Sequence, residues 1–397
     1  MQTAQPWRHP CAFYLATQQS IKEPQMTSTV NHNRKKVVVI GGGYAGIAAA
    51  SALDDVADVT LIDRKTAFFH RVAALRAAVD PAWTDRPFLP YDRLLRNGSV
   101  VHGTVSAIEP ELRHITLETG EVLSFDAAII ATGSEASAPA QFGGTTVNSA
   151  AATMQKHQRN IRDARSVVIV GGGPVGVELA GEIRTLHPDK TMTLVQAEET
   201  LLAGSTPKLG HRAHELLVSK GVTVRLGQHF DAAEHPDSLV LWAVGNKPNT
   251  GWFGKAHGDK LTERGLIRVD RQLRVDGWDA IFAIGDANDA DPKKLVMPAI
   301  AQAKVAARNV RAVLARKKAD AVYQSPRGEM LIVPVGPDDG VSVLAGVVVG
   351  RGITRRLKGT DLFLPKYRNS LNLPRHHEHA TLAVSVTARD GDQVAKA

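Results

Sequence analysis

Short apolar runs alternate along this chain with small or polar residues, and their lengths distinguish strands from helices. Mainly apolar runs predict buried parallel strands at 37–40, 59–62, 127–130, 167–170, 192–195, 222–226, 239–244 and 280–284. Apolar residues at helical spacing predict helices at 68–76, up to Leu186, at 207–220 and at about 298–316. Alternating residues and turn residues predict further strands at 100–105, 114–118, 330–333 and 341–349, with a hairpin at 118–121.

Two glycine-rich turns of the same pattern lie 130 residues apart, each between a predicted strand and a predicted helix. The first comprises Gly41, Gly42, Gly43, Tyr44, Ala45 and Gly46, and the second contains Gly171, Gly173 and Gly176. Both match G-x-G-x-x-G, whose glycines allow a tight turn, close approach to a pyrophosphate, and close packing of helix on strand. The pyrophosphate then lies at the positive end of the helix dipole. One such turn also occurs for packing alone, but two in this context predict two dinucleotide sites.

The residues that end the next strand differ between the two units. Asp63 lies 17 residues after Gly46, where a carboxylate accepts hydrogen bonds from an adenosine ribose, although a merely solvated acid is the alternative. In the second unit Gln196 takes that position, with Glu198 just beyond. A glutamine does not repel a 2′-phosphate, and no arginine follows to bind one. The pattern favours NADH and leaves NADPH open.

The order of elements predicts an α/β fold with two Rossmann-like dinucleotide-binding domains and a small C-terminal α+β module. The first domain is discontinuous and comprises 34–140 and 246–320, and the second comprises 141–245. The module takes 321–380, between a disordered N-terminal extension at 1–33 and a loose tail at 381–397. The second unit has only about a dozen residues where the first has an extra hairpin, so its meander is predicted to be shortened.

Composition limits the ligands and the redox groups that the chain can use. The net charge of +8 over 397 residues favours acidic ligands, and no basic run with interleaved aromatics predicts a specific nucleic-acid partner. The single cysteine, Cys11, excludes a disulfide and a thiol–disulfide relay within the chain, which is typical of a reducing compartment. No metal site is predicted.

The chain has no run of about 20 apolar residues, so a cytoplasmic protein is expected. Peripheral membrane contact stays open because of one basic, partly apolar segment near the C-terminus. That segment carries Arg351, Ile353, Arg355, Arg356, Leu357, Lys358, Leu362, Phe363 and Lys366. Packing of this segment on its own domain is the favoured alternative.

These landmarks together resemble the flavoproteins with two dinucleotide folds. Within them the chain is most similar to the apoptosis-inducing-factor-2-like, or ferroptosis-suppressor, flavoproteins, with type II NADH dehydrogenases as relatives. The similarity covers about 35–375, and its motifs are 37–46, 72–76, 131–133, 171–178, 284–286 and 356–363. The last of these, Arg-Leu-Lys-Gly-Thr-Asp-Leu-Phe, points to the subfamily. The chain begins Met1-Gln2, so the glycine needed for N-myristoylation is absent and a lipid anchor is not carried over.

The resemblance implies FAD on the first glycine turn and NADH or NADPH on the second. It places Asp63, Arg76, Val105, Thr132, Gly133, Gly285 and Asp286 around the FAD, and Gln196 beside the pyridine nucleotide. It also directs Glu178 toward the nicotinamide and Lys358 toward the flavin, as candidate catalytic residues. Stabilisation of the helix dipole is the alternative for Glu178, and a solvated lysine the alternative for Lys358.

The expected function is an FAD-dependent oxidoreductase that takes hydride from NAD(P)H and reduces a quinone-like or other small acceptor. Sulfide:quinone reductases and disulfide reductases are excluded, because they need thiols. One alternative is a reductase of a small iron protein of the ferredoxin or rubredoxin type, for which the basic surface is suited. Another is a slow NADH-sensing flavoprotein that acts by binding. A homodimer stays open.

Overall fold

The computed structural model describes residues 34–136, 139, 144–326 and 328–374. The predicted N-terminal extension at 1–33 and the tail at 381–397 lie outside these residues. Among the described helices, none combines the length and apolar character needed to cross a bilayer.

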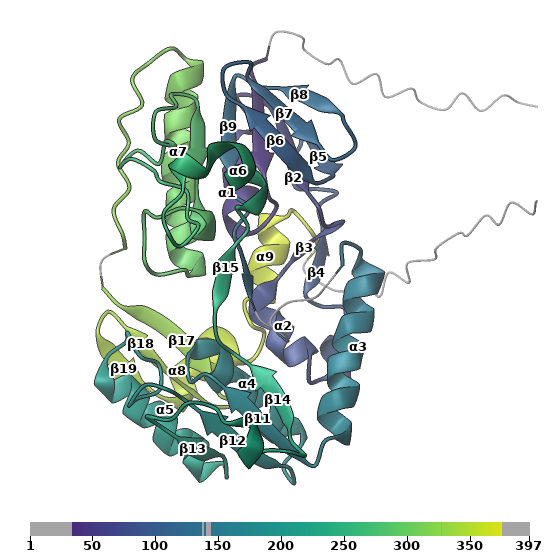
Figure 1. Cartoon of the computed structure of the whole chain (residues 1–397), viewed down its shortest axis with the longest axis vertical. Helices are drawn as coiled ribbons and strands as arrows, with labels where there is room; N and C mark the ends of the chain where they lie inside the picture. The colour runs from purple at the N-terminus through teal and green to yellow at the C-terminus, as the bar shows by residue number, and fades with distance from the viewer. Residues whose placement is uncertain (1–33, 137–138, 140–143, 327, 375–397) are drawn as a thin grey trace, which may run out of the picture. The chain divides into compact units, whose positions relative to one another are not determined.

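The first unit is built on a five-stranded parallel sheet in the order β16-β9-β1-β2-β5. Figure 1 labels β9, β2 and β5 of this sheet. Its strands are β1 Lys36–Ile40, β2 Asp58–Asp63, β5 Ser99–His102, β9 Ala127–Ile130 and β16 Ile281–Ala283. Although β16 follows the whole second sheet along the chain, it pairs with β9. The order reverses between β1 and β9, and the crevice at such a switch point is where α/β sheets bind ligands.

Alternate residues of β1 enter two different cores, as a strand with period two requires. Val37 and Val39 pack with α1 Tyr44–Leu53 and α7 Val296–Leu314 on one face. Val38 and Ile40 face the meander β6-β7-β8, whose strands are Val105–Glu109, His114–Leu117 and Val122–Ser124. The sheet is thus covered on both faces, which explains why its strands are mainly apolar.

The second unit repeats this plan with four parallel strands in the order β13-β12-β11-β14. The strands are β11 Ser166–Val170, β12 Thr191–Val195, β13 Thr223–Arg225 and β14 Leu239–Trp242, with helices α4 Pro174–Leu186 and α5 Pro207–Ser219. Between β13 and β14 there is one 3₁₀ turn, Ala232–Glu234, and no meander. The predicted shortening is confirmed, and the core on that face is limited to Val168, Val170 and Val195 with their neighbours.

Two short strands join the units where the chain crosses between them. β10 Ser134–Ala136 follows β9, β15 Asn246–Pro248 follows β14, and the two pair antiparallel. Helix α6 Gly251–His257 then leads back toward β16. The predicted α/β class with two parallel, Rossmann-like sheets is confirmed, whereas the domain boundaries stay a prediction.

The C-terminal module has an antiparallel sheet of β17 Met330–Pro334, β18 Gly340–Leu344 and β19 Val347–Val349. The region predicted as one strand at 341–349 is therefore a hairpin of two. The basic segment forms α8 Arg351–Thr354, a π-helical turn Arg355–Gly359, and α9 Leu364–Ser370. The side chains of this segment differ in burial. Ile353 and Leu357 are exposed, whereas Leu362 and Lys358 are buried. The expectation that Leu362 and Lys358 could meet a membrane is thus wrong.

Two other elements differ from the sequence-based expectation. The helix predicted at 68–76 is split into β3 Ala67–Phe69 and α2 Arg71–Ala77, because β3 pairs with the distant β4 Phe88–Pro90. Residues Val147–Asp163, for which no element was predicted, form α3. Its buried face carries Ala150, Met154, Gln158 and Ile161, and Thr146 caps its N-terminus.

Candidate functional site

The first glycine turn is fixed by the strand next to it. Gly41 N–H donates to the carbonyl of Ile62 at 2.7 Å, and Gly42 N–H donates to Asp63 Oδ2 at 2.5 Å. Gly41 has φ +104°, and a Cβ there would lie 2.4 Å from the Ala131 carbonyl oxygen. A Cβ on Gly46 would lie 1.7 Å from the Gly41 carbonyl oxygen. Both positions therefore exclude any side chain.

The second turn reproduces this arrangement bond for bond. Gly171 N–H donates to the carbonyl of Val195 at 2.8 Å, and Gly172 N–H donates to Gln196 Oε1 at 2.7 Å. A Cβ on Gly176 would lie 1.9 Å from the Gly171 carbonyl oxygen. Asp63 and Gln196 thus hold equivalent positions, and each binds the second residue of its turn, Gly42 or Gly172.

Each turn leaves open space at the second glycine of its G-x-G-x-x-G motif, which is Gly43 or Gly173. A Cβ on Gly43 or Gly173 would meet no described atom within 4 Å, and neither residue has a side chain to cap the helix that it begins. The first N–H groups of α1 and α4 therefore have no capping side chain there, as an anion site at a helix N-terminus requires. The hydroxyl of Thr132 is buried without a partner among the described residues. These features fit a bound dinucleotide at each turn.

Three distant segments meet at the first turn. A Cβ on Gly41 would lie 2.9 Å from Thr132 Cα, and one on Gly285 would lie 3.3 Å from Ala45 Cβ. Gly133 and Gly285 both have positive φ, +67° and +74°. The structure therefore brings the segments 41–46, 131–133 and 285–286 together, as predicted for one cofactor.

Side chains beyond these loops hold them in place. Asp286 Oδ2 accepts a hydrogen bond from Ser134 Oγ at 2.7 Å. Buried Gln302 accepts from Gly285 N–H at 2.7 Å, and Asn249 Nδ2 donates to the Thr132 carbonyl at 3.0 Å. Tyr91 donates to the Gly42 carbonyl at 2.9 Å.

Two predicted residues turn their side chains away from the turn. Tyr44 packs among Phe68, His70 and Tyr367, and its hydroxyl lies 2.9 Å from His70 Nδ1. Burial lowers the pKa of His70 to about 4, so this imidazole is neutral near pH 7. Val105 begins β6, and its side chain lies in the core between the meander and the sheet. The backbone of Val105 is thus left for the contact that the resemblance implies.

The guanidinium of Arg76 is bound by groups of the protein itself. It lies on α2 and forms a bidentate ion pair with Glu182 of α4, with N–O distances of 2.9 and 2.8 Å. It also donates to the carbonyls of Gly359 and Thr360, at 2.8 and 3.2 Å. These contacts fix Arg76 within the protein, and its place near the FAD stays a prediction.

Glu178 and Lys358 bind each other, although 180 residues separate them. Lys358 Nζ lies 2.6 Å from Glu178 Oε1, and their side chains are 10% and 9% exposed. Lys358 also donates to the Ile332 carbonyl at 3.2 Å. Burial raises the pKa of Glu178, although Lys358 opposes that rise. The alternatives of a helix-dipole acid and a solvated lysine therefore do not describe these two side chains.

Four residues of this region were not predicted from the sequence: Tyr91, Glu182, Asn249 and Gln302. A signal existed for Glu182, because it lies one turn after Glu178 on the buried face of an amphipathic helix. Nothing local marks Tyr91, Asn249 or Gln302, whose partners are 49, 117 and 17 residues away.

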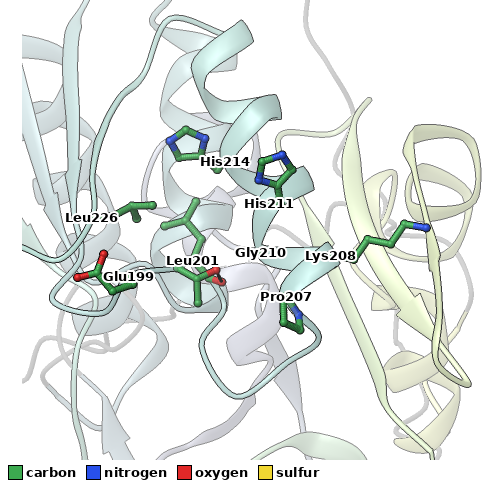
Figure 2. Close-up of a pocket in the computed structure, with 9 residues that line it drawn as sticks. Glu199, Leu201, Pro207, Lys208, Gly210, His211, His214 and Leu226 are labelled. Atoms are coloured by element: carbon green, nitrogen blue, oxygen red, sulfur yellow. Dashed lines mark hydrogen bonds between the residues drawn. The ribbon is translucent and has the colours of Figure 1, made fainter.

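A separate pocket lies on the second unit, between the loop after β12 and the start of α5 (Figure 2). Glu199, Leu201, Lys208, His211 and His214 are among its lining residues. None of the predicted site residues lines it. It adjoins the second turn, because a Cβ on Gly172 would lie 2.5 Å from Cδ2 of the lining residue Leu201.

Comparison with known proteins agrees with this geometry. Residues 35–309 match the family model described as pyridine nucleotide-disulphide oxidoreductase. The chain is 32% identical to ferroptosis suppressor protein 1 of Homo sapiens, over 83% of this chain and 93% of that one. It is 31% identical to apoptosis-inducing factor homolog B of Dictyostelium discoideum, over 86% and 98%.

Among solved structures, NDH2 of Plasmodium falciparum in complex with NADH aligns with a TM-score of 0.67 at 14% identity. That alignment covers 85% of this chain and 98% of the other, and it supports the fold alone. The predicted resemblance and the two-unit fold are confirmed, and so is the expectation of FAD and pyridine-nucleotide cofactors at the level of the family. The chain belongs to the pyridine nucleotide-disulphide oxidoreductase family and is an FAD-dependent oxidoreductase of pyridine nucleotides.

Proposed function

We propose that this protein passes hydride equivalents from NAD(P)H through FAD to a quinone-like acceptor. The observation that carries the proposal is the pair of equivalent glycine turns, one on each parallel sheet, each with open space at a helix N-terminus. The chain has no cysteine pair, so electrons leave the flavin directly for the acceptor. The resemblance to ferroptosis-suppressor flavoproteins and type II NADH dehydrogenases supports a quinone.

In this proposal the first turn holds FAD and the second holds the pyridine nucleotide. The N-terminus of α1 binds the FAD pyrophosphate, Asp63 meets the adenosine ribose, and Thr132 and Asp286 supply polar contacts. The N-terminus of α4 binds the second pyrophosphate, beside Gln196. When bound, FAD accepts a hydride and can return its electrons in one-electron or two-electron steps.

The buried pair Glu178–Lys358 supplies charge and a proton at the reacting end. Reduction of a quinone by NAD(P)H consumes one proton besides the hydride, and it yields the quinol and the oxidised nucleotide. Lys358 Nζ is a buried ammonium that can donate this proton, and Glu178 Oε1 fixes its direction. Because burial raises the pKa of Glu178, its carboxyl can hold a proton more readily than an exposed one.

Stopped-flow spectroscopy of the purified protein tests this function in two half-reactions. NADH and NADPH should each be mixed with the oxidised flavoprotein, and the reduced protein then mixed with a short-chain ubiquinone, with ferredoxin or with rubredoxin. The proposal predicts rapid flavin bleaching by nucleotide and rapid recovery with the quinone. Bleaching without recovery on quinone would contradict the acceptor, and protein that neither retains nor rebinds FAD would contradict the whole proposal.

The small iron proteins in that experiment represent the alternative acceptor. The fold of NADH:rubredoxin oxidoreductase from Clostridium acetobutylicum aligns with this chain at a TM-score of 0.58 and 20% identity. The net charge of +8 is suited to an acidic protein partner. Recovery with ferredoxin or rubredoxin but not with quinone, weakened by salt, would select this alternative.

A further inference from the structure

Two buried ion pairs lie one helical turn apart on α4. Glu178 binds Lys358, and Glu182, four residues later, binds Arg76. The Arg76–Glu182 pair is the more deeply buried, with side chains 4% and 6% exposed. Among the ion pairs between described residues, only these two have both side chains exposed by 10% or less. The second pair has no role in the proposed chemistry, so its burial needs another explanation.

The guanidinium of Arg76 binds both segments that carry the Glu178–Lys358 pair. Its Nε and one terminal nitrogen bind the carboxylate of Glu182, which lies on the helix that carries Glu178. Its terminal nitrogens also donate to the carbonyls of Gly359 and Thr360, the two residues that follow Lys358. One planar group thus fixes the helix on one side and the lysine-bearing backbone on the other.

The backbone that carries Lys358 needs such support. It forms a π-helical turn, a rare geometry that leaves its hydrogen bonds irregular. Further along the same segment, Leu362 and Phe363 have positive φ values of +53° and +63°. Such values are strained for residues other than glycine. Gly359 is packed so closely that a Cβ would lie 2.6 Å from the Pro337 carbonyl oxygen.

From these contacts we infer that Arg76 and Glu182 are positioning residues, which hold Lys358 Nζ against Glu178 at the reacting end. The inference rests on the proposed function, because Lys358 is given its chemical role there. A lysine at position 76 could not replace the arginine, since an ammonium cannot bind a carboxylate through two parallel bonds and also reach two carbonyls. The face of Trp83, 4.8 Å from the Arg76 guanidinium carbon, further fixes its plane.

The test compares Glu182→Gln in two backgrounds, the natural protein and Lys358→Met. In the natural background Glu182→Gln should slow flavin reduction or quinone turnover roughly tenfold, the size of one lost charge-assisted hydrogen bond. In the Lys358→Met background the same change should slow it less than about twofold, because the residue being positioned is gone. Glu234→Gln, which neutralises the exposed partner of Arg225, is the matched control and should leave the rate unchanged.

A second readout does not depend on activity. Lysine acetylation by acetic anhydride, followed by mass spectrometry, should modify Lys358 several times faster in Glu182→Gln and in Arg76→Lys than in the natural protein. Lys294, which is bonded to the Asn288 carbonyl elsewhere in the fold, is the internal reference and should not change. Retained FAD absorbance and an unchanged circular dichroism spectrum identify folded variants, and Arg76→Lys replaces Glu182→Gln if the latter does not fold.

Equal slowing by Glu182→Gln in both backgrounds, or unchanged acetylation of Lys358, would overturn the positioning role and leave the pair as a simple link between α2 and α4. If Lys358→Met alone leaves both half-reactions unchanged, the proposed role of Lys358 fails instead. The acetylation result still decides whether Arg76 and Glu182 hold that lysine. The two failures are therefore distinguishable.

Discussion

Replacing Lys358 by methionine should make the stability of the protein depend on pH in a defined direction. The side chain has nearly the same length, but the ammonium that lies 2.6 Å from Glu178 Oε1 is lost. Glu178 is then left buried beside Glu182, which raises its pKa, with Arg76 as the remaining basic group that lowers it. Because burial already raises the pKa of Glu178, loss of its main partner raises that pKa further.

The sign follows from proton linkage. A carboxyl whose native pKa is raised binds protons more tightly in the folded state than in the unfolded state. Its full stability is therefore present below the ordinary glutamate pKa of about 4.3 and is lost as the pH rises toward the native value. Relative to the natural protein, Lys358→Met should lose free energy of unfolding progressively between about pH 4.5 and pH 7.5.

The loss of free energy of unfolding cannot exceed the cost of keeping the Glu178 carboxyl protonated. At about pH 7.5, keeping the carboxyl protonated costs roughly 1.36 kcal/mol for each of about 3.2 pH units, or about 4.4 kcal/mol. That limit agrees with the roughly 3–5 kcal/mol measured when one partner of a buried ion pair is removed. The side chain of Glu178 is only 9% exposed, so solvent reduces this cost little.

Urea denaturation at about pH 5 and about pH 7.5, followed by circular dichroism, measures the effect. The double variant Glu178→Gln, Lys358→Met lacks the Glu178 carboxyl, whose titration causes the loss, and should recover most of the stability lost at the higher pH. Lys220→Met is the matched control, because the Lys220–Asp339 pair is 3.6 Å long and partly exposed, so its loss costs at most about 1 kcal/mol. A loss for Lys358→Met that is the same at both pH values would refute this reasoning.

Three further results are expected. Gly43→Ala should fold but retain much less FAD, because its Cβ enters open space at the first turn, whereas Gly46→Ala should not fold, because its Cβ would lie 1.7 Å from a carbonyl oxygen; flavin absorbance and circular dichroism separate the two. Gln196→Glu should lower kcat/KM for NADPH at least tenfold more than for NADH, since a carboxylate there repels a 2′-phosphate; equal losses would remove this residue from nucleotide selection. Exposed Ile353 and Leu357 lie among arginines, so co-sedimentation with vesicles rich in phosphatidylserine should be sensitive to salt and should weaken when both residues are changed to aspartate; equal sedimentation with neutral vesicles would contradict this.

Features that depend on neighbouring residues could be predicted from the amino-acid sequence. A strand, a tight turn and a helix within ten residues are governed by local sterics, so Gly41, Gly46, Gly171 and Gly176 could be assigned from their spacing. The buried parallel strands were equally evident, because a sheet covered on both faces has mainly apolar strands. The family resemblance then selected Glu178 and Lys358, but not the fact that they bind each other.

Which polar groups share a buried site could be seen only after the chain was folded. Arg76 and Glu182 are 106 residues apart, and no local pattern shows that one guanidinium joins α2, α4 and the backbone after Lys358. The strand at Ala67–Phe69 was misassigned for the same reason, since its partner β4 begins 19 residues later at Phe88. Pairing and burial depend on which distant segments the fold brings together. Sequence periodicity reports only the face on which a residue lies, so it could place Glu182 on α4 but could not identify its partner.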